Sequence, residues 1–130
     1  MSRKSKGINA ERDLIHKFWA TKEWAAVRIA GSGSSRYPSA DVLASNRIRK
    51  LAIECKTSKE DSKYIPHEEI EQLKEFAEIY GAEPLIAMRF NKTAWHFLAL
   101  EDMKKTESSY AITKELAEQK GLLFEEIIER

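Results

Sequence analysis

The stretch "YPSADVLASNRIRKLAIECK" (residues 37–56) contains two short apolar segments separated by the polar turn "NRIR". Apolar and polar side chains alternate around this turn, which predicts two antiparallel strands joined by it. If the turn has four residues, Ala44 pairs with Leu51, and Asp41 falls opposite Glu54 on the neighbouring strand. The stretch therefore predicts a hairpin that brings two carboxylates together at one end.

Lys56 shares the face of Glu54 because side chains alternate along a strand. Directly opposed residues have Cβ atoms roughly 4.5–5.5 Å apart, so the carboxylates of Asp41 and Glu54 repel unless a cation lies between them. Mg²⁺ prefers such oxygens and keeps water and substrate phosphate in its remaining positions. Lys56 would stabilise a phosphate or help to activate water. The alternative is a charged strand end with an ordinary Glu–Lys pair. Cys55 faces the other way and is predicted to be a core residue.

A further acid, Glu11, precedes the hairpin. Leu14, Ile15 and Phe18 have the spacing of a helix with one apolar stripe, and Glu11 continues that stripe. An acid on the buried face of a helix is unusual unless it is paired or binds a metal. The alternative is an acid that stabilises the helix N-terminus. Position alone leaves both interpretations open.

The remaining segments predict an α/β fold with a mixed central β-sheet flanked by helices. Its 130 residues suit one domain. After the first helix we expect, in order, a strand at 25–30, a Gly/Ser-rich loop at 31–39, the hairpin, a helix that begins near Pro66 and ends at Gly81, two strands joined at 91–92, and one or two helices in the last thirty residues.

Charge is distributed unevenly along the chain, although the net charge is only +1. Residues 1–50 hold 11 Lys and Arg against 4 Asp and Glu, whereas residues 51–130 hold 11 against 17. This asymmetry favours an N-terminal surface that faces a polyanion. The alternative is a basic, solvated face. The acidic helix at 68–78 is predicted to be solvated or to face a partner.

Composition predicts an intracellular, cytoplasmic protein. The single cysteine excludes an internal disulfide and a cysteine-based zinc cluster. We expect no membrane helix, because no apolar run approaches the roughly 20 residues that one needs. The basic N-terminus "MSRKSKG" is not followed by an apolar segment and is not a secretory signal.

Four motifs, "NAERDL", "RIAGS", "YPSAD" and "AIECK", together resemble the archaeal-type Holliday junction resolvases. These are restriction-endonuclease-like nucleases with a PD-(D/E)xK motif. The resemblance implies one nuclease domain over residues 1–130 with catalytic motifs in 7–100, and the tail after Leu100 matches the family poorly. For that tail the sequence pattern alone predicts helices, at about 108–130. Pro38 departs from the motif, since it lies three residues before Asp41 rather than immediately before it.

The resemblance also implies the site residues. By this likeness the catalytic residues are Glu11, Ser32, Asp41, Glu54 and Lys56. Of these, Ser32 matches a loop serine tied to catalysis in part of the family, and Glu11 an additional helical acid. One or two Mg²⁺ ions, or Mn²⁺ as a substitute, would be held by Asp41, Glu54, the backbone carbonyl of Cys55, and Glu11 directly or through water.

DNA contacts are expected from eight basic residues that surround the motifs in sequence: Arg3, Lys4, Lys6, Arg12, Arg28, Arg36, Lys59 and Lys63. Three more, Arg47, Arg49 and Lys50, lie at the far end of the hairpin and are either solvated or in contact with DNA. The resemblance implies a nucleoid-associated homodimer that makes paired nicks across a four-way junction in recombination and repair. The alternatives are another PD-(D/E)xK nuclease that cuts duplex DNA in repair or restriction, and a catalytically silent DNA-binding module.

Overall fold

The computed structural model describes residues 3–34 and 36–129, and the side chains from residue 7 onward. Four helices are described: α1 (Arg3–Ala20), α2 (His67–Tyr80), α3 (Lys114–Lys120) and α4 (Phe124–Ile127). The six strands of the main sheet, in spatial order, are β1 (Ala25–Arg28), β2 (Val42–Ser45), β3 (Lys50–Ser58), β5 (Glu83–Phe90), β6 (His96–Ala99) and β9 (Leu122–Leu123). A smaller sheet contains β4 (Ser62–Pro66), β8 (Ser109–Thr113) and β7 (Lys104–Lys105).

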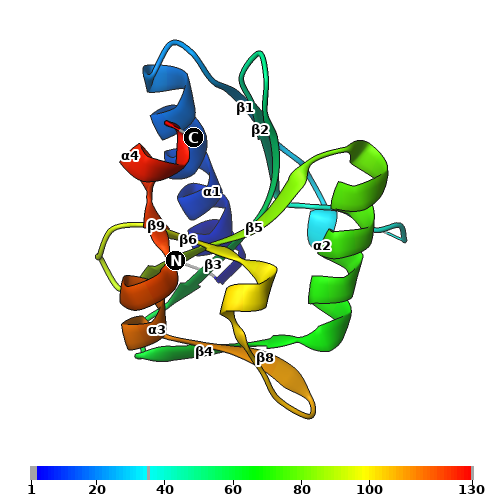
Figure 1. The fold of residues 1–130 in the computed structure, drawn as a ribbon, viewed down its shortest axis with the longest axis vertical. Coiled ribbons are helices and arrows are strands. Elements are labelled where there is room, and N and C mark those ends of the chain that lie inside the picture. The colour runs from blue at the N-terminus through cyan, green and yellow to red at the C-terminus, as the bar shows by residue number, and fades with distance from the viewer. Residues whose placement is uncertain (1–2, 35, 130) are drawn as a thin grey trace.

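The main sheet is mixed, because β3 and β5 are parallel and its other neighbours are antiparallel. Parallel neighbours need a long crossover connection, and here the crossover contains α2. Figure 1 shows α1 and α2 on opposite sides of the sheet. The predicted fold class, a mixed sheet flanked by helices, is confirmed. Among the described residues, no helix is both long and apolar enough to cross a membrane.

The hairpin has the predicted register: Ser45 pairs with Lys50, and Ala44 with Leu51. Its turn is held by the side chain of Asn46, whose Oδ1 accepts backbone hydrogen bonds from Ile48 (2.8 Å) and Arg49 (2.7 Å). These two bonds close the four-residue turn, which sets the pairing of every residue that follows it.

Both faces of β3 are buried, which the alternation within the hairpin did not indicate. Leu14 and Phe18 of α1 lie in the core on one face, together with Leu51. Ile70 of α2 lies in the core on the other face, together with the fully buried Ala52. A strand at the centre of a mixed sheet is covered on both sides. The face that carries Glu54 and Lys56 is therefore a core face with polar residues at one end.

The prediction of a purely helical tail at 108–130 is wrong in part. Residues 109–113 form β8, which pairs antiparallel with β4, and its Ile112 is fully buried. The helix α3 begins only at Lys114, where the Thr113 side chain accepts a hydrogen bond (3.0 Å) from the Leu116 amide. A short strand, β9, then separates α3 from α4. Pairing with β4, which the sequence did not indicate, outweighs the weak helical pattern here.

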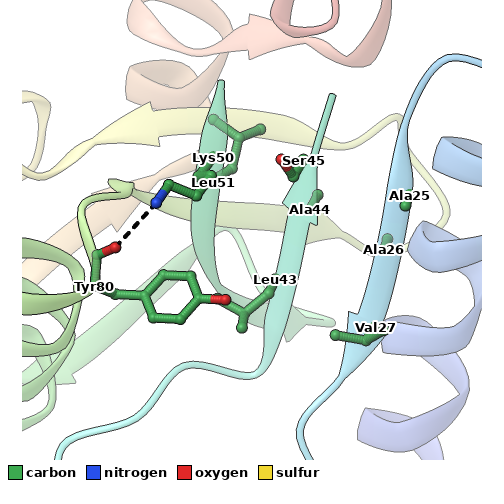
Figure 2. Close-up of a pocket in the computed structure, with 9 residues that line it drawn as sticks. All are labelled: Ala25, Ala26, Val27, Leu43, Ala44, Ser45, Lys50, Leu51 and Tyr80. Carbon is green, nitrogen blue, oxygen red and sulfur yellow. Dashed lines mark hydrogen bonds between the residues drawn. The ribbon is translucent and has the colours of Figure 1, made fainter. Parts of the chain in front are cut away.

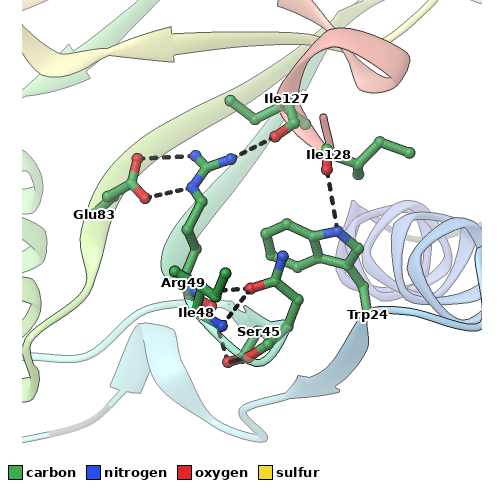
Figure 3. Close-up of polar contacts among 8 residues, drawn as sticks. Trp24, Ser45, Ile48, Arg49, Glu83, Ile127 and Ile128 are labelled. Atoms are coloured by element: carbon green, nitrogen blue, oxygen red, sulfur yellow. Dashed lines mark hydrogen bonds and ion pairs between the residues drawn. The ribbon is translucent and has the colours of Figure 1, made fainter. Parts of the chain in front are cut away.

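Arg49 links the C-terminal segment at Ile127 to strand β5 of the main sheet (Figure 3). Its guanidinium donates to both carboxylate oxygens of Glu83 (2.8 and 2.9 Å) and to the carbonyl oxygen of Ile127 (2.8 Å), and it lies 5.7 Å from the ring centroid of Trp24. The Trp24 indole in turn donates to the Ile128 carbonyl (3.4 Å). Arg49 is therefore a structural residue, and neither of the two roles expected for it describes these contacts.

Candidate active site

Asp41 lies at the centre of the candidate site, at the point where the hairpin pairing ends. Its backbone amide donates to the Ile53 carbonyl (3.0 Å), and β2 begins at the next residue. The side chain accepts two hydrogen bonds: Ser32 Oγ donates to Oδ1 (2.6 Å), and the Cys55 backbone amide donates to Oδ2 (2.9 Å). Both oxygens of the carboxylate are therefore oriented by neighbours from different segments.

Glu54 lies beside Asp41, close enough for the two side chains to interact. Burial and the charge of Asp41 raise the pKa of Glu54 to about 8. Two adjacent carboxylates cannot both ionise easily without a cation, so Glu54 keeps its proton at neutral pH. The structure brings these two predicted residues together.

Glu11 reaches the same region from α1. Its pKa is raised to about 7, mainly by burial and then by the charge of Asp41, while the guanidinium of Arg28 acts in the opposite direction. Arg28 Nη1 lies 3.8 Å from Glu11 Oε1, and both side chains are largely buried. The position of Glu11 next to Arg28 and within the field of Asp41 favours a role in the site over a simple helix-terminus charge. The helix itself begins eight residues earlier, at Arg3.

Lys56 extends from the same face of β3 and forms an ion pair with Glu69 of α2, with 3.0 Å between Nζ and Oε2. The expectation that the acidic helix is only solvated or partner-facing is wrong for this residue. One sequence signal could have located it: Glu69 directly precedes Ile70, the first residue of the apolar stripe of α2, and so borders the buried face.

Cys55 packs against the core on the α1 side of the sheet, as predicted. Burial raises the pKa of its thiol well above the usual range, and the carboxylates of Asp41 and Glu11 add to this effect. A thiol that holds its proton so firmly is a poor nucleophile. The sulfur of Cys55 is thus a packing group, whereas its backbone lies beside Asp41.

The donor set fits a hard divalent cation that keeps several of its waters. Within the described residues, no three His, Cys, Asp or Glu side chains are grouped so that they could hold a metal ion by themselves. Asp41 and Glu54 offer two adjacent carboxylates whose repulsion a cation would relieve. Mg²⁺ is commonly bound by one or two carboxylates, with water and substrate phosphate completing its coordination.

The predicted DNA-binding residues differ in how exposed their side chains are. Arg12, Arg36 and Lys59 are exposed, whereas Arg28 and Lys63 are half-buried. The other three, Arg3, Lys4 and Lys6, lie outside the residues whose side chains are described.

The fold and this site define a class of protein. A mixed sheet whose central hairpin presents an acid pair and a lysine, with a helical acid beside them, is the arrangement of a restriction-endonuclease-like nuclease. A family model described as archaeal Holliday junction resolvase (hjc) matches residues 2–130. The chain belongs to this archaeal Holliday junction resolvase family.

Individual relatives agree with this assignment. A crossover junction endodeoxyribonuclease Hjc of Archaeoglobus fulgidus is 38% identical over 130 residues, which cover 95% of each protein. One of Sulfolobus acidocaldarius is 32% identical over 130 residues, covering 98% of this chain and 90% of the relative. The solved structure of Archaeoglobus fulgidus Hjc, a Holliday junction resolvase, superimposes with a TM-score of 0.86 at 36% identity and covers 93% of this chain and 97% of that one.

The predicted family and enzyme class are therefore confirmed. Nucleases of this family are metal-dependent, and they act on Holliday junction DNA. The family match extends to residue 130, whereas the sequence motifs that carried the resemblance end near residue 100.

Proposed function

We propose that this chain resolves four-way DNA junctions by metal-dependent hydrolysis of one phosphodiester in each of two strands, with Mg²⁺ as the ion and Mn²⁺ as a substitute. One observation carries the proposal: Asp41 and Glu54 lie next to each other at the end of the hairpin, and Lys56 extends from the same face. Family membership supports the choice of substrate. The enzyme would act inside the cell, on recombining DNA.

The ion would be held by the carboxylates of Asp41 and Glu54 and by the backbone carbonyl of Cys55, with Glu11 binding directly or through water. When bound, such an ion supplies Lewis-acid stabilisation of the phosphate and of the leaving 3′ oxygen. Groups of the protein itself orient the side chains that would bind this ion. The hydroxyl of Ser32 and the amide of Cys55 orient the Asp41 carboxylate.

Lys56 supplies the positive charge nearest to the acid pair. The pKa of its ammonium is lowered by burial but raised overall by the carboxylates of Glu69, Glu54 and Asp41. A protonated Lys56 would donate hydrogen bonds to the scissile phosphate and orient the attacking water. Ser32, in the turn Ser32–Ser34, would hold Asp41 while its loop reaches over the scissile strand.

Phosphate contacts by the basic residues would bind the junction without reading its bases. Arg12, Arg36 and Lys59 are accessible for this role, and Arg28 would combine a phosphate contact with its contact to Glu11. Lys63 and the N-terminal Arg3, Lys4 and Lys6 would add further phosphate contacts. Binding should weaken steeply as salt rises, because each neutralised phosphate releases a counterion.

A second copy of the chain would complete the enzyme, because paired nicks need two active sites. An apolar groove between the β1–β3 side of the sheet and the end of α2 supports this proposal (Figure 2). Val27 and Tyr80 line it and are 56% and 47% exposed. Exposed apolar surface of this kind commonly marks a protein interface. We expect a dimer in sedimentation equilibrium, and a monomer after Val27→Glu.

The deciding experiment compares a four-way junction with a matched linear duplex in Mg²⁺. Symmetric paired nicks in the junction alone are expected, together with loss of cleavage in Asp41→Ala and Lys56→Ala. Comparable cutting of both substrates would favour a duplex nuclease. Wild-type cleavage by either variant, or no metal binding even with DNA present, would refute the proposed mechanism.

A further inference from the structure

Glu69 contacts the candidate catalytic lysine although it lies in none of the motifs that define the site. Glu69 Oε2 is 3.0 Å from Lys56 Nζ, and the Lys56 side chain is only 19% exposed. Among the ion pairs of the described residues, Lys56 is paired with Glu69 rather than with Glu54, its near neighbour on the same face of β3.

The backbone of Glu69 is held firmly relative to β3. Its neighbour Ile70 is 2% exposed, and Leu73, one turn further along, is 1% exposed. Ile65, just before the helix, is fully buried. Since α2 is anchored on both sides of Glu69, the carboxylate reaches Lys56 from a rigid element rather than from a mobile loop. Side chains on such elements hold catalytic groups in more precise positions.

The ammonium group of a lysine keeps one orientation only when a partner holds it. Its ammonium has three N–H donors on a flexible stem of four carbons. A hydrogen bond to Glu69 uses one donor and restricts the rotation of the other two. In the proposed function these two donors would point to the phosphate and the attacking water beside the acid pair.

We propose that Glu69 is a positioning residue for Lys56. The Glu69 carboxylate accepts one hydrogen bond from the Lys56 ammonium and thereby directs the remaining N–H donors of Lys56 at the scissile phosphate. This inference rests on the proposed function, because it requires Lys56 to be catalytic. It assigns to the acidic helix α2 an indirect part in the chemistry of the site, through Lys56. It also explains why an acid borders the buried face of that helix.

Glu68 provides a matched control within the same turn. Both residues lie in the first turn of α2, where an acid also stabilises the helix N-terminus. Glu68 is exposed, and its Oε1 accepts a hydrogen bond from Gln72 (3.5 Å). Replacing either acid removes the same charge from the helix start, but only Glu69 contacts Lys56. A purely structural contribution would therefore appear equally in both variants.

The test measures the single-turnover rate of junction cleavage in Mg²⁺ and, separately, junction affinity and melting temperature for each variant. Glu69→Ala should lower the rate about 10- to 100-fold, as outer-shell substitutions commonly do, with junction affinity and melting temperature unchanged. Glu69→Gln should recover most of the rate, because its amide oxygen still accepts the hydrogen bond. Glu68→Ala should cut at the wild-type rate.

Combination with Lys56→Ala separates the two proposals. Glu69→Ala should cause no further loss in a chain that already carries Lys56→Ala, because a positioning residue acts only through its partner. A wild-type rate in Glu69→Ala, or equal losses in Glu69→Ala and Glu68→Ala, would overturn the inference while leaving the proposed function intact. A wild-type rate in Lys56→Ala would instead overturn the proposed function.

Discussion

Asp41 and Glu54 lie next to each other at the end of the hairpin, where the register of the two strands brings them together. Burial, and then the charge of Asp41, raises the pKa of Glu54 to about 8. Glu11, in the field of the same Asp41, has its pKa raised to about 7. Two acids that hold their protons more tightly than usual thus lie at the place where the proposed function requires a cation.

The first prediction concerns the stability of the metal-free protein. Glu54 releases its proton near pH 4.5 when the chain is unfolded, but only near pH 8 when it is folded. Between these values the folded state binds the proton more tightly, so stability is lost as the pH rises. Thermal unfolding in EDTA should show Glu54→Gln to be more stable than wild type at pH 8.

At pH 5 the two proteins should unfold at nearly the same temperature, because Glu54 is then mostly protonated in the native state. Glu78→Gln, which replaces an exposed acid of α2, serves as the control and should follow wild type at both pH values. A constant difference between Glu54→Gln and wild type across this range would contradict the assigned pKa.

The second prediction is that metal binding releases protons. An ion bound to Asp41 and Glu54 must displace the proton of Glu54. Glu11, with a pKa of about 7, is partly protonated at pH 7 and releases that fraction of a proton. Calorimetric titration with Mn²⁺ at pH 7 in two buffers of different ionisation enthalpy should show release of about one proton per site. The number should fall in Glu54→Gln, and equal heats in both buffers would refute the prediction.

The third prediction concerns Ser32. Its hydroxyl donates a 2.6 Å hydrogen bond to Asp41, which orients a proposed metal ligand. Ser32→Ala should lower the cleavage rate about 10- to 100-fold at low Mg²⁺ while junction affinity stays unchanged. Ser34→Ala is the matched control, since the Ser34 hydroxyl lies in the same turn but donates to the Gly31 carbonyl. A similar loss in both variants would indicate a general effect on the loop.

The fourth prediction separates structural from DNA-binding arginines. Arg49→Ala should lower the free energy of unfolding by about 1–2 kcal/mol, because it removes charged hydrogen bonds to Glu83 and Ile127 that are partly open to solvent. Arg47→Ala, at the exposed neighbouring position of the same turn, should leave stability unchanged. Denaturant unfolding measures both, and unaltered stability in Arg49→Ala would show that the tail is held by packing alone.

Much of the hairpin could be predicted because its determinants are local. The alternation of side chains and the short turn after Ser45 together specify which residues face one another, and the observed pairs of Ala44 with Leu51 and Ser45 with Lys50 follow that rule. The end of α2 was equally predictable, because Gly81 adopts the left-handed conformation (φ 80°) that ends helices.

The C-terminal region could not be predicted in the same way. Residues 109–113 form a strand only because β4 is available to pair with them, and β4 is itself short and polar. Neither segment has enough local preference to form alone. Long-range pairing of this kind decides the structure of weakly patterned segments, so their sequence patterns were uninformative.

By itself, the sequence determined the hairpin, its register, and the grouping of Asp41, Glu54 and Lys56 on one face, because these follow from the period of a strand and the length of one turn. Only the tertiary structure decided which groups hold those side chains in place. Ser32 reaches Asp41 from a loop, Glu69 reaches Lys56 from a helix that packs on the same face of the sheet, and Arg49 reaches the chain end. These contacts depend on how the helices and loops pack against the sheet, which no local pattern encodes.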